Sequence, residues 1–320
     1  MAVNTEVSDD DLLSIKNAFD LPENEGFNGI AAGVENSNFL LQTTGGSYIQ
    51  TLYEKRVAPC DLPYFLSLMQ HLATKGIACP TPIAGRDGAA LRELNGRPAA
   101  LVTFLTGLWP RRIHSFHCQE LGHHLARMHI AGSDFPMTRA NALSVEGWRP
   151  LFEACAQRAD EVRPGLGEEL ERELRRLEQI WPEGLPAGVI HADLFPDNVF
   201  FRDQRLTGLI DFYFACNDAF AYDLAICLNA WCFEPDGAFN VTKARALLKS
   251  YGQTRALEQA ELEALPTLAA GSALRFLLTR LYDWLNHPPG AFVKPKDPLE
   301  YWKKLRFHSD LSGPAAYGLD

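Results

Sequence analysis

The sequence lacks the features that mark disulfide-stabilised, zinc-binding and membrane-spanning proteins. Its seven cysteines are scattered and no two form a Cys-x-x-Cys pair, so neither a disulfide framework nor a zinc site is indicated. The first six residues contain neither a basic nor an apolar segment, so no signal peptide is predicted. The most apolar run, residues 224–233, is too short to cross a bilayer. These absences favour a reducing cytoplasm.

A surplus of basic charge is also absent. Lys and Arg together number 30 against 40 Asp and Glu, which gives a net charge of -10. This balance argues against nucleic acid or an anionic membrane as a partner. It does not exclude ATP, which needs only local donors and a cation. The 320 residues, 47% of them hydrophobic, favour two domains or lobes of an ordinary globular protein, and they indicate no oligomeric state.

One polar loop stands out between segments with strand character. Val189 and Ile190 predict the end of a buried strand, and the loop after them carries His191, Asp193 and Asn198 in the pattern His-x-Asp-x-x-x-x-Asn. The same residues could belong to a loop that caps a helix, and a histidine at this position often orients its loop. The segment after the loop distinguishes these alternatives.

A predicted hairpin brings a second carboxylate back to this loop. Residues 199–202 and 205–210 are rich in β-forming side chains and are separated by two polar residues. The chain therefore reverses, and Asp211 is expected beside Asn198, with Asp193 projecting nearby. Carboxylate and amide oxygens without His or Cys suit Mg²⁺, which takes its other ligands from water and substrate phosphates.

The spacing from Asp193 through Asn198 to Asp211 is the catalytic arrangement of kinases. In that arrangement Asp193 accepts the proton of the attacking hydroxyl as general base. Asn198 and Asp211 hold the Mg²⁺ that bridges the phosphates. His191 is expected to complete the catalytic loop. An isolated His-x-Asp-x-x-x-x-Asn motif would be weak, but the hairpin and the second Asp make the prediction specific.

Several segments resemble the aminoglycoside-phosphotransferase-type kinase superfamily. They are residues 191–201 (HADLFPDNVFF), 209–215 (LIDFYFA) and 218–225 (DAFAYDLA), with supporting stretches at 51–57 and 275–284. Within that superfamily the sequence is most similar to the bacterial homoserine kinases, and the likeness runs over most of the chain.

The resemblance implies a bilobal, protein-kinase-like α+β fold, with a small antiparallel-sheet lobe in residues 1–104 and a mostly helical lobe in residues 105–320. It implies transfer of the γ-phosphoryl group of ATP, with Mg²⁺, to the side-chain hydroxyl of L-homoserine, giving O-phospho-L-homoserine. It also implies that Asp223 holds the backbone of the catalytic loop. The alternatives are another small-alcohol kinase, acting on choline, a sugar or an aminoglycoside, and a nucleotide-binding pseudokinase.

The N-terminal third predicts a nucleotide site. Short strands are expected at residues 27–33, 39–42 and 48–53. The turn between the first two carries Asn36, Ser37 and Asn38, small residues that offer donors to phosphate oxygens. By the resemblance alone, the Thr103 carbonyl and the Leu105 amide would meet the edge of the adenine ring.

One feature of kinases is missing from this part of the sequence. Kinases carry a Lys or Arg on the third strand that pairs with an acid on the next helix. Here Thr51 occupies the strand position, and the expected helix at residues 62–73 contains no Glu. The joint absence is coherent, because a lone buried charge is costly. Lys55 or Arg56 could reach the phosphates instead, although an exposed basic turn also explains them.

The C-terminal part predicts helices, with residues 272–286 as the last long one and a surface tail after Trp302. On that helix Arg275 and Arg280 are candidates for the carboxylate of the amino-acid substrate, and Asp283 for its ammonium group. Ordinary surface or inter-helix ion pairs are the alternative for all three. His129, on an earlier helix, is expected in the core rather than in a metal site.

Overall fold

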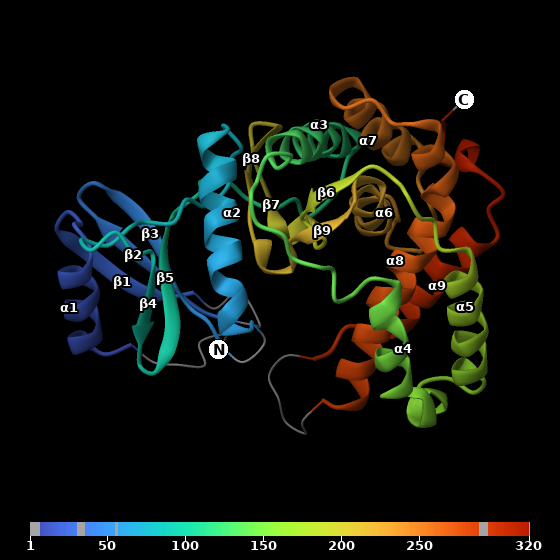
Figure 1. The fold of residues 1–320 in the computed structure, drawn as a ribbon, viewed down its shortest axis with the longest axis horizontal. Coiled ribbons are helices and arrows are strands. Elements are labelled where there is room, and N and C mark those ends of the chain that lie inside the picture. Colours follow the sequence, from blue (N-terminus) through green and yellow to red (C-terminus); the bar gives the residue numbers. More distant parts are fainter. Residues whose placement is uncertain (1–6, 31–35, 55–56, 288–293, 320) are drawn as a thin grey trace.

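The computed structural model describes residues 7–30, 36–54, 57–287 and 294–319, and it consists of two lobes (Figure 1). One lobe is built on an antiparallel sheet and the other is mostly helical, which confirms the predicted bilobal α+β fold. The predicted boundary near Phe104 falls directly after strand β5 (Arg97–Thr103) and stays a prediction.

The N-terminal lobe contains antiparallel strands in the order β1-β2-β3-β5-β4. Their bounds, in that order, are Asn24–Gly29, Ser37–Thr43, Gly46–Leu52, Arg97–Thr103 and Leu91–Leu94. The expected N-terminal strands are present, but the second begins at Ser37. Ser37 and Asn38 therefore belong to a strand rather than to a turn, and residues 31–35 of the expected turn lie outside the described residues.

Helices α1 (Asp9–Ala18) and α2 (Leu62–Thr74) cover opposite faces of this sheet. Ala99 and Leu101 of β5 share a small core with α1, whereas Ala100 between them shares a larger core with α2. Alternate residues of a strand point to opposite faces, which explains the division. The core beneath α2 continues into the C-terminal lobe, so α2 joins the two lobes.

Two small antiparallel sheets lie where the lobes meet. Strand β6 (Ala187–Ile190) pairs with β9 (Cys216–Ala219), and β7 (Val199–Arg202) pairs with β8 (Arg205–Leu209). Asp203 and Gln204 between β7 and β8 have φ values of 49° and 64°, as a two-residue type I′ turn requires. The predicted hairpin is confirmed. Strand β9 was not predicted, because Asn and Asp are unfavourable in strands.

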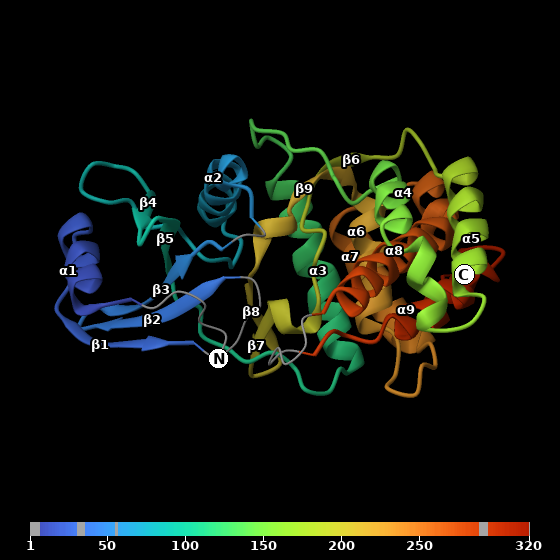
Figure 2. The same cartoon turned by 90° about the horizontal axis from the view of Figure 1, so that it is seen from below.

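Helices make up most of the C-terminal lobe, and Figure 2 shows α6 to α9 gathered on the side away from the sheet. The helices are α3 (Ser115–Ala131), α4 (Val145–Glu153), α5 (Leu166–Ile180), α6 (Phe220–Trp231), α7 (Val241–Thr254), α8 (Gln259–Leu285) and α9 (Pro298–Ser309). Helix α3 packs against α7, and α8 packs against α6 and α9. None of the helices in the described part of the chain is long and apolar enough to cross a membrane.

Two expectations about the C-terminal region are wrong. Helix α8 begins at Gln259 rather than near residue 272, because it tolerates Pro266, which the sequence alone suggests as a helix breaker. The expected surface tail after Trp302 is instead part of α9, whose Tyr301 and His308 are buried. Charged residues between these apolar and aromatic positions conceal the helical pattern in the sequence.

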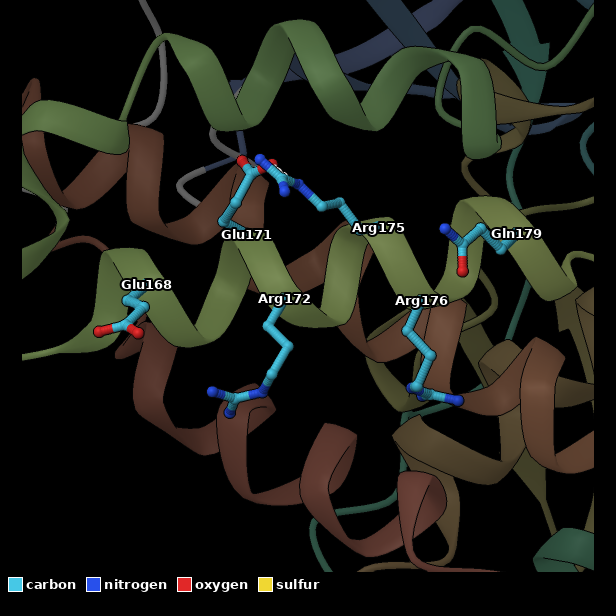
Figure 3. Close-up of a pocket in the computed structure, with 6 residues that line it drawn as sticks. All are labelled: Glu168, Glu171, Arg172, Arg175, Arg176 and Gln179. Atoms are coloured by element: carbon cyan, nitrogen blue, oxygen red, sulfur yellow. Dashed lines mark hydrogen bonds and ion pairs between the residues drawn. The ribbon is translucent and has the colours of Figure 1, made fainter.

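The outer face of α5 is a charged surface (Figure 3). Glu168, Arg172 and Arg175 are exposed, and Arg175 pairs with Glu171 one helical turn earlier. Pairs of this kind support an exposed helix and contribute little beyond that. This hollowed surface lies on a different element from the polar loop after β6.

Candidate active site

A buried carboxylate holds the catalytic loop after β6. Asp223 of α6 accepts hydrogen bonds from the backbone amides of His191, at 2.7 Å, and Ala192, at 3.0 Å. It accepts a third from His129 Nε2 at 3.1 Å. Ala192 has a φ of 61°, which is strained for a residue other than glycine, so the loop needs such support. The Asp223 side chain, in the first turn of α6, lies where the implied loop-holding role requires.

The partners of Asp223 fix its charge. Burial by itself raises the pKa of Asp223, but the hydrogen bond and charge interactions with His129 and His191 lower it more, and the pKa lies below its ordinary value. Burial lowers the pKa of His129, which favours a neutral ring. Because the neutral His129 ring donates through Nε2, its Nδ1 accepts a hydrogen bond from the Tyr251 hydroxyl, 2.7 Å away. His129 is therefore the packed core histidine that the sequence predicts.

Arg275 of α8 holds the next polar group of the same loop. Its Nη1 donates to the carbonyl of Ala192, and its guanidinium lies 4.3 Å from the centre of the Phe276 ring. The residue is 2% exposed. Buried charges thus hold both the amide and the carbonyl of Ala192, the residue directly before Asp193. We expected Arg275 to bind the substrate carboxylate, but its burial and its contact favour positioning of the loop.

The ring of His191 connects the catalytic loop to the segment that carries Asp211. The residue is fully buried, and its Nε2 donates to the carbonyl of Ile210 at 2.9 Å. Burial lowers the pKa of His191, so the ring stays neutral. We expected His191 among the catalytic residues. A buried ring bonded to a backbone carbonyl favours a role in orienting the loop, and a catalytic role for His191 stays a prediction.

The hairpin brings Asn198 beside the segment that carries Asp211. The amide of Ile210 donates to the carbonyl of Asn198 at 3.0 Å, next to the first residue pair of the hairpin. The side-chain nitrogen of Asn198 donates to the backbone oxygen of Asp193 at 2.8 Å and lies 3.4 Å from its carboxylate. The three polar residues of the predicted site are therefore neighbours.

Asn198 and Asp211 present oxygens of the kind that Mg²⁺ prefers. Because the Asn198 nitrogen is engaged by Asp193, the amide oxygen remains for a cation. Among the residues that the structure describes, no group of three or more His, Cys, Asp or Glu could hold a metal ion. Two protein oxygens, from Asn198 and Asp211, fit a Mg²⁺ site whose other ligands are water and phosphate.

The side chains expected at the nucleotide are engaged within the N-terminal lobe. Asn36 accepts a hydrogen bond from the Glu54 amide at 3.2 Å, and the Ser37 hydroxyl donates to the Glu54 carboxylate at 2.8 Å. The Thr51 hydroxyl donates to Asn38, also at 2.8 Å. These bonds tie the start of β2 to the end of β3. Contact with phosphate oxygens stays a prediction.

The segment that follows β5 connects the two lobes, and it packs on the hairpin of β7 and β8, called here the catalytic hairpin. Leu108 and Phe201 exchange backbone hydrogen bonds of 3.0 and 2.9 Å. A Cβ at Gly107 would lie 2.5 Å from a side-chain oxygen and 2.8 Å from a side-chain carbon of the hairpin, so this close approach requires glycine. Thr103 and Leu105 lie at the start of the connector. Their contact with adenine stays a prediction.

The other residues expected at the acceptor lie near the C-terminal end of α8. Arg280 donates to the Glu300 carboxylate at 2.7 Å, and its guanidinium lies 4.4 Å from the centre of the Tyr301 ring. Asp283 comes three residues later on the helix and is half-buried. Arg280 thus forms the inter-helix ion pair that was the alternative interpretation. The substrate roles of Arg280 and Asp283 stay predictions.

Two tyrosines at the site were missed from the sequence. Tyr301 of α9 is buried, its ring lies 4.4 Å from the Arg280 guanidinium, and its hydroxyl has no hydrogen-bond partner within the described residues. Tyr213 lies 3.1 Å, hydroxyl to hydroxyl, from Tyr53. Tyr213 could have been found from the sequence, because it lies two residues after Asp211, a predicted metal ligand. Tyr301 had no such signal, because its helix was not predicted.

Comparison with known proteins shows the enzyme family to which the chain belongs. Residues 26–257 match the model of the phosphotransferase enzyme family, and the chain belongs to this family. Among solved structures, a complex of the amicoumacin kinase hAmiN with AMP-PNP and Ca²⁺ has a TM-score of 0.69 at 15% identity, covering 95% of this chain and 93% of that one. At this identity the likeness shows a shared fold.

Curated relatives narrow the class. The homoserine kinase of Rhodospirillum rubrum is 63% identical over 319 residues, which cover 100% of this chain and 99% of the relative. The homoserine kinase of Bradyrhizobium diazoefficiens is 64% identical over 320 residues, which cover 100% and 98%. Within the phosphotransferases the chain groups with the homoserine kinases, and the resemblance found in its sequence is confirmed.

Proposed function

We propose that Asp193 is the general base when this chain transfers the γ-phosphoryl group of ATP to the side-chain hydroxyl of L-homoserine. The observation that carries this assignment is the double hold on Ala192 by Asp223 and Arg275. A strained loop fixed at both polar groups gives the next residue, Asp193, a defined position. Full-length identity to homoserine kinases supports the acceptor.

In the proposed reaction the homoserine oxygen bonds to the γ-phosphorus while the bond from that phosphorus to the β,γ-bridging oxygen breaks. Asp193 takes the hydroxyl proton, and the products are ADP and O-phospho-L-homoserine. Phosphoryl transfer of this kind depends on positioning and on charge neutralisation rather than on covalent catalysis. The hydrogen bond from Asn198 helps to orient the Asp193 segment toward the hydroxyl.

Asn198 and Asp211 are the residues that would hold Mg²⁺. When bound, this cation neutralises charge on the phosphates. The chain itself fixes the two ligands relative to each other, because the Ile210 amide bonds to the Asn198 carbonyl and the His191 ring bonds to the Ile210 carbonyl.

The nucleotide contacts are proposed on resemblance and position. Thr103 and Leu105 would meet the adenine edge through their backbones, because the connector that carries them lies on the catalytic hairpin. Asn36, Ser37 and Asn38 would face the phosphates from the start of β2. The proposed place of the enzyme is the cytoplasm.

The acceptor site must hold a zwitterion beside Asp193. We assign the substrate carboxylate to Arg280 and the ammonium group to Asp283, because the buried Arg275 already donates to the loop carbonyl of Ala192. The bound carboxylate would then compete with Glu300 for the Arg280 guanidinium, or share it. Choline and sugars lack this pair of charged groups.

A coupled assay of ATP turnover against a panel of amino acids, amines, sugars and aminoglycosides tests the function. We expect L-homoserine to give the highest kcat/KM. A preference for choline, a sugar or an aminoglycoside would overturn the assignment of the acceptor. Nucleotide binding without turnover of any acceptor would indicate a pseudokinase.

A further inference from the structure

A contact between two hydroxyls joins strand β3 to the loop that carries Asp211. Tyr53 directly follows β3, and Tyr213 lies in the short 3-10 helix Phe212–Phe214. Their hydroxyl oxygens are 3.1 Å apart, and their rings meet edge to face with centroids 5.3 Å apart. This contact links residues that are 160 positions apart in the sequence.

Other parts of the N-terminal lobe also converge on Tyr213. The ring of Phe65, from α2, meets the Tyr213 ring edge to face at 5.7 Å. Tyr53 lies two residues after Thr51, the strand position where kinases carry a Lys or Arg, and Thr51 itself donates to Asn38 of β2. Tyr213 is therefore contacted by the residue that follows β3 and by α2, and in other kinases an ion pair joins these two elements.

The Asp211 segment needs support on both sides. Asp211 has a φ of 66°, in the left-handed region, and such a residue persists only where its surroundings fix it. On its N-terminal side the bonds of Ile210 to Asn198 and His191 provide this support. On its C-terminal side Tyr213 meets the N-terminal lobe.

We propose that Tyr213, together with Tyr53, positions the Asp211 loop against the N-terminal lobe and takes the place of the strand Lys and helix Glu that the sequence lacks. The role is carried by uncharged hydroxyls and rings, which avoids a lone buried charge. Tyr213 is a positioning residue that acts through Asp211. The inference rests on the proposed role of Asp211 as a Mg²⁺ ligand.

The test uses the full-length protein and needs no turnover. Tyr213→Phe removes the hydroxyl and keeps the ring contacts with Phe65. Calorimetric titration of ADP at a series of Mg²⁺ concentrations should show the half-maximal Mg²⁺ concentration raised by roughly two- to tenfold, the effect of losing one hydrogen bond. ADP affinity without Mg²⁺ should hardly change. Tyr53→Phe should give a similar shift, and the double variant no more than the larger single one, because both remove the same bond.

Tyr317→Phe is the matched control, because the buried Tyr317 hydroxyl bonds to His308 at 2.8 Å, away from the Asp211 loop. It should leave the Mg²⁺ dependence unchanged, and equal shifts in the Tyr213 and Tyr317 variants would overturn the inference. A wild-type Mg²⁺ dependence in Tyr213→Phe would do so as well, while loss of that dependence in Asp211→Asn would leave the proposed function standing. An unchanged dependence in Asp211→Asn would overturn the metal assignment together with the inference.

Discussion

Replacing Asp223 with Asn should release the catalytic loop. The carboxylate accepts hydrogen bonds from the His191 amide, the Ala192 amide and His129 Nε2, at 2.7, 3.0 and 3.1 Å. An Asn side chain offers one acceptor oxygen, and its NH₂ group would face a donor, so at least one buried N–H loses its partner. Hydrogen bonds to charged groups contribute about 1.5–3 kcal/mol, and breaking a buried charged network costs about 3–5 kcal/mol. We expect the free energy of unfolding to fall by roughly this last amount.

Lower stability alone would not show a role in the loop, so the assay compares two variants. Glu261 is also fully buried and accepts hydrogen bonds from Arg255 and from the Glu258 amide, at the start of α8. Urea unfolding should show both Asp223→Asn and Glu261→Gln to be destabilised. Only Asp223→Asn should lower kcat, by on the order of 10²-fold, the effect of misplacing a catalytic group by about 1 Å. A folded Asp223→Asn enzyme with wild-type kcat, or an equal loss of kcat in Glu261→Gln, would show that Asp223 does not act through the loop.

Three further predictions concern the acceptor, the metal and the dependence on pH. Arg275→Ala should lower kcat with little change in KM for homoserine, whereas Arg280→Ala should raise that KM roughly tenfold; steady-state kinetics that show the same pattern for both would contradict the assignment. Asn198→Ala should weaken MgADP binding less than Asp211→Asn does, and calorimetry that ranks them the other way would count against the ligand roles. Burial lowers the pKa of His308 to about 3. Below pH ~6.5 the unfolded chain therefore binds a proton that the folded chain does not, and the free energy of unfolding should fall by up to about 1.4 kcal/mol per pH unit as the pH drops toward 3. His308→Gln should remove this part of the slope in urea titrations, and an unchanged slope would show that another group causes it.

The catalytic hairpin could be predicted because its signals are local. Two runs of β-forming residues flank Asp203-Gln204, and a two-residue turn leaves only one way to pair them. The closeness of Asn198 and Asp211 follows from that pairing, since both lie just beyond the open end of the hairpin. The identities of these side chains then point to Mg²⁺ without further knowledge of the fold.

The supports of the site could not be predicted from local sequence. The bond from Arg275 to Ala192 joins residues 83 positions apart, and the bond from His129 to Asp223 joins residues 94 apart. A guanidinium suits a substrate carboxylate and a backbone carbonyl equally well, so the chemistry of Arg275 could not choose between them. Its burial between helices favours the carbonyl, and burial depends on the packing of the whole lobe.

The proposed mechanism depends above all on Asp193, which takes the proton of the homoserine hydroxyl in a loop fixed by Asp223 and Arg275. A single-turnover measurement on Asp193→Asn, at saturating MgATP and homoserine, isolates this step when MgATP affinity is measured on the same protein. We predict a rate lower by on the order of 10²-fold or more, with an affinity for MgATP close to that of the wild type. A wild-type rate of phosphoryl transfer in this variant would contradict the role of Asp193 as general base.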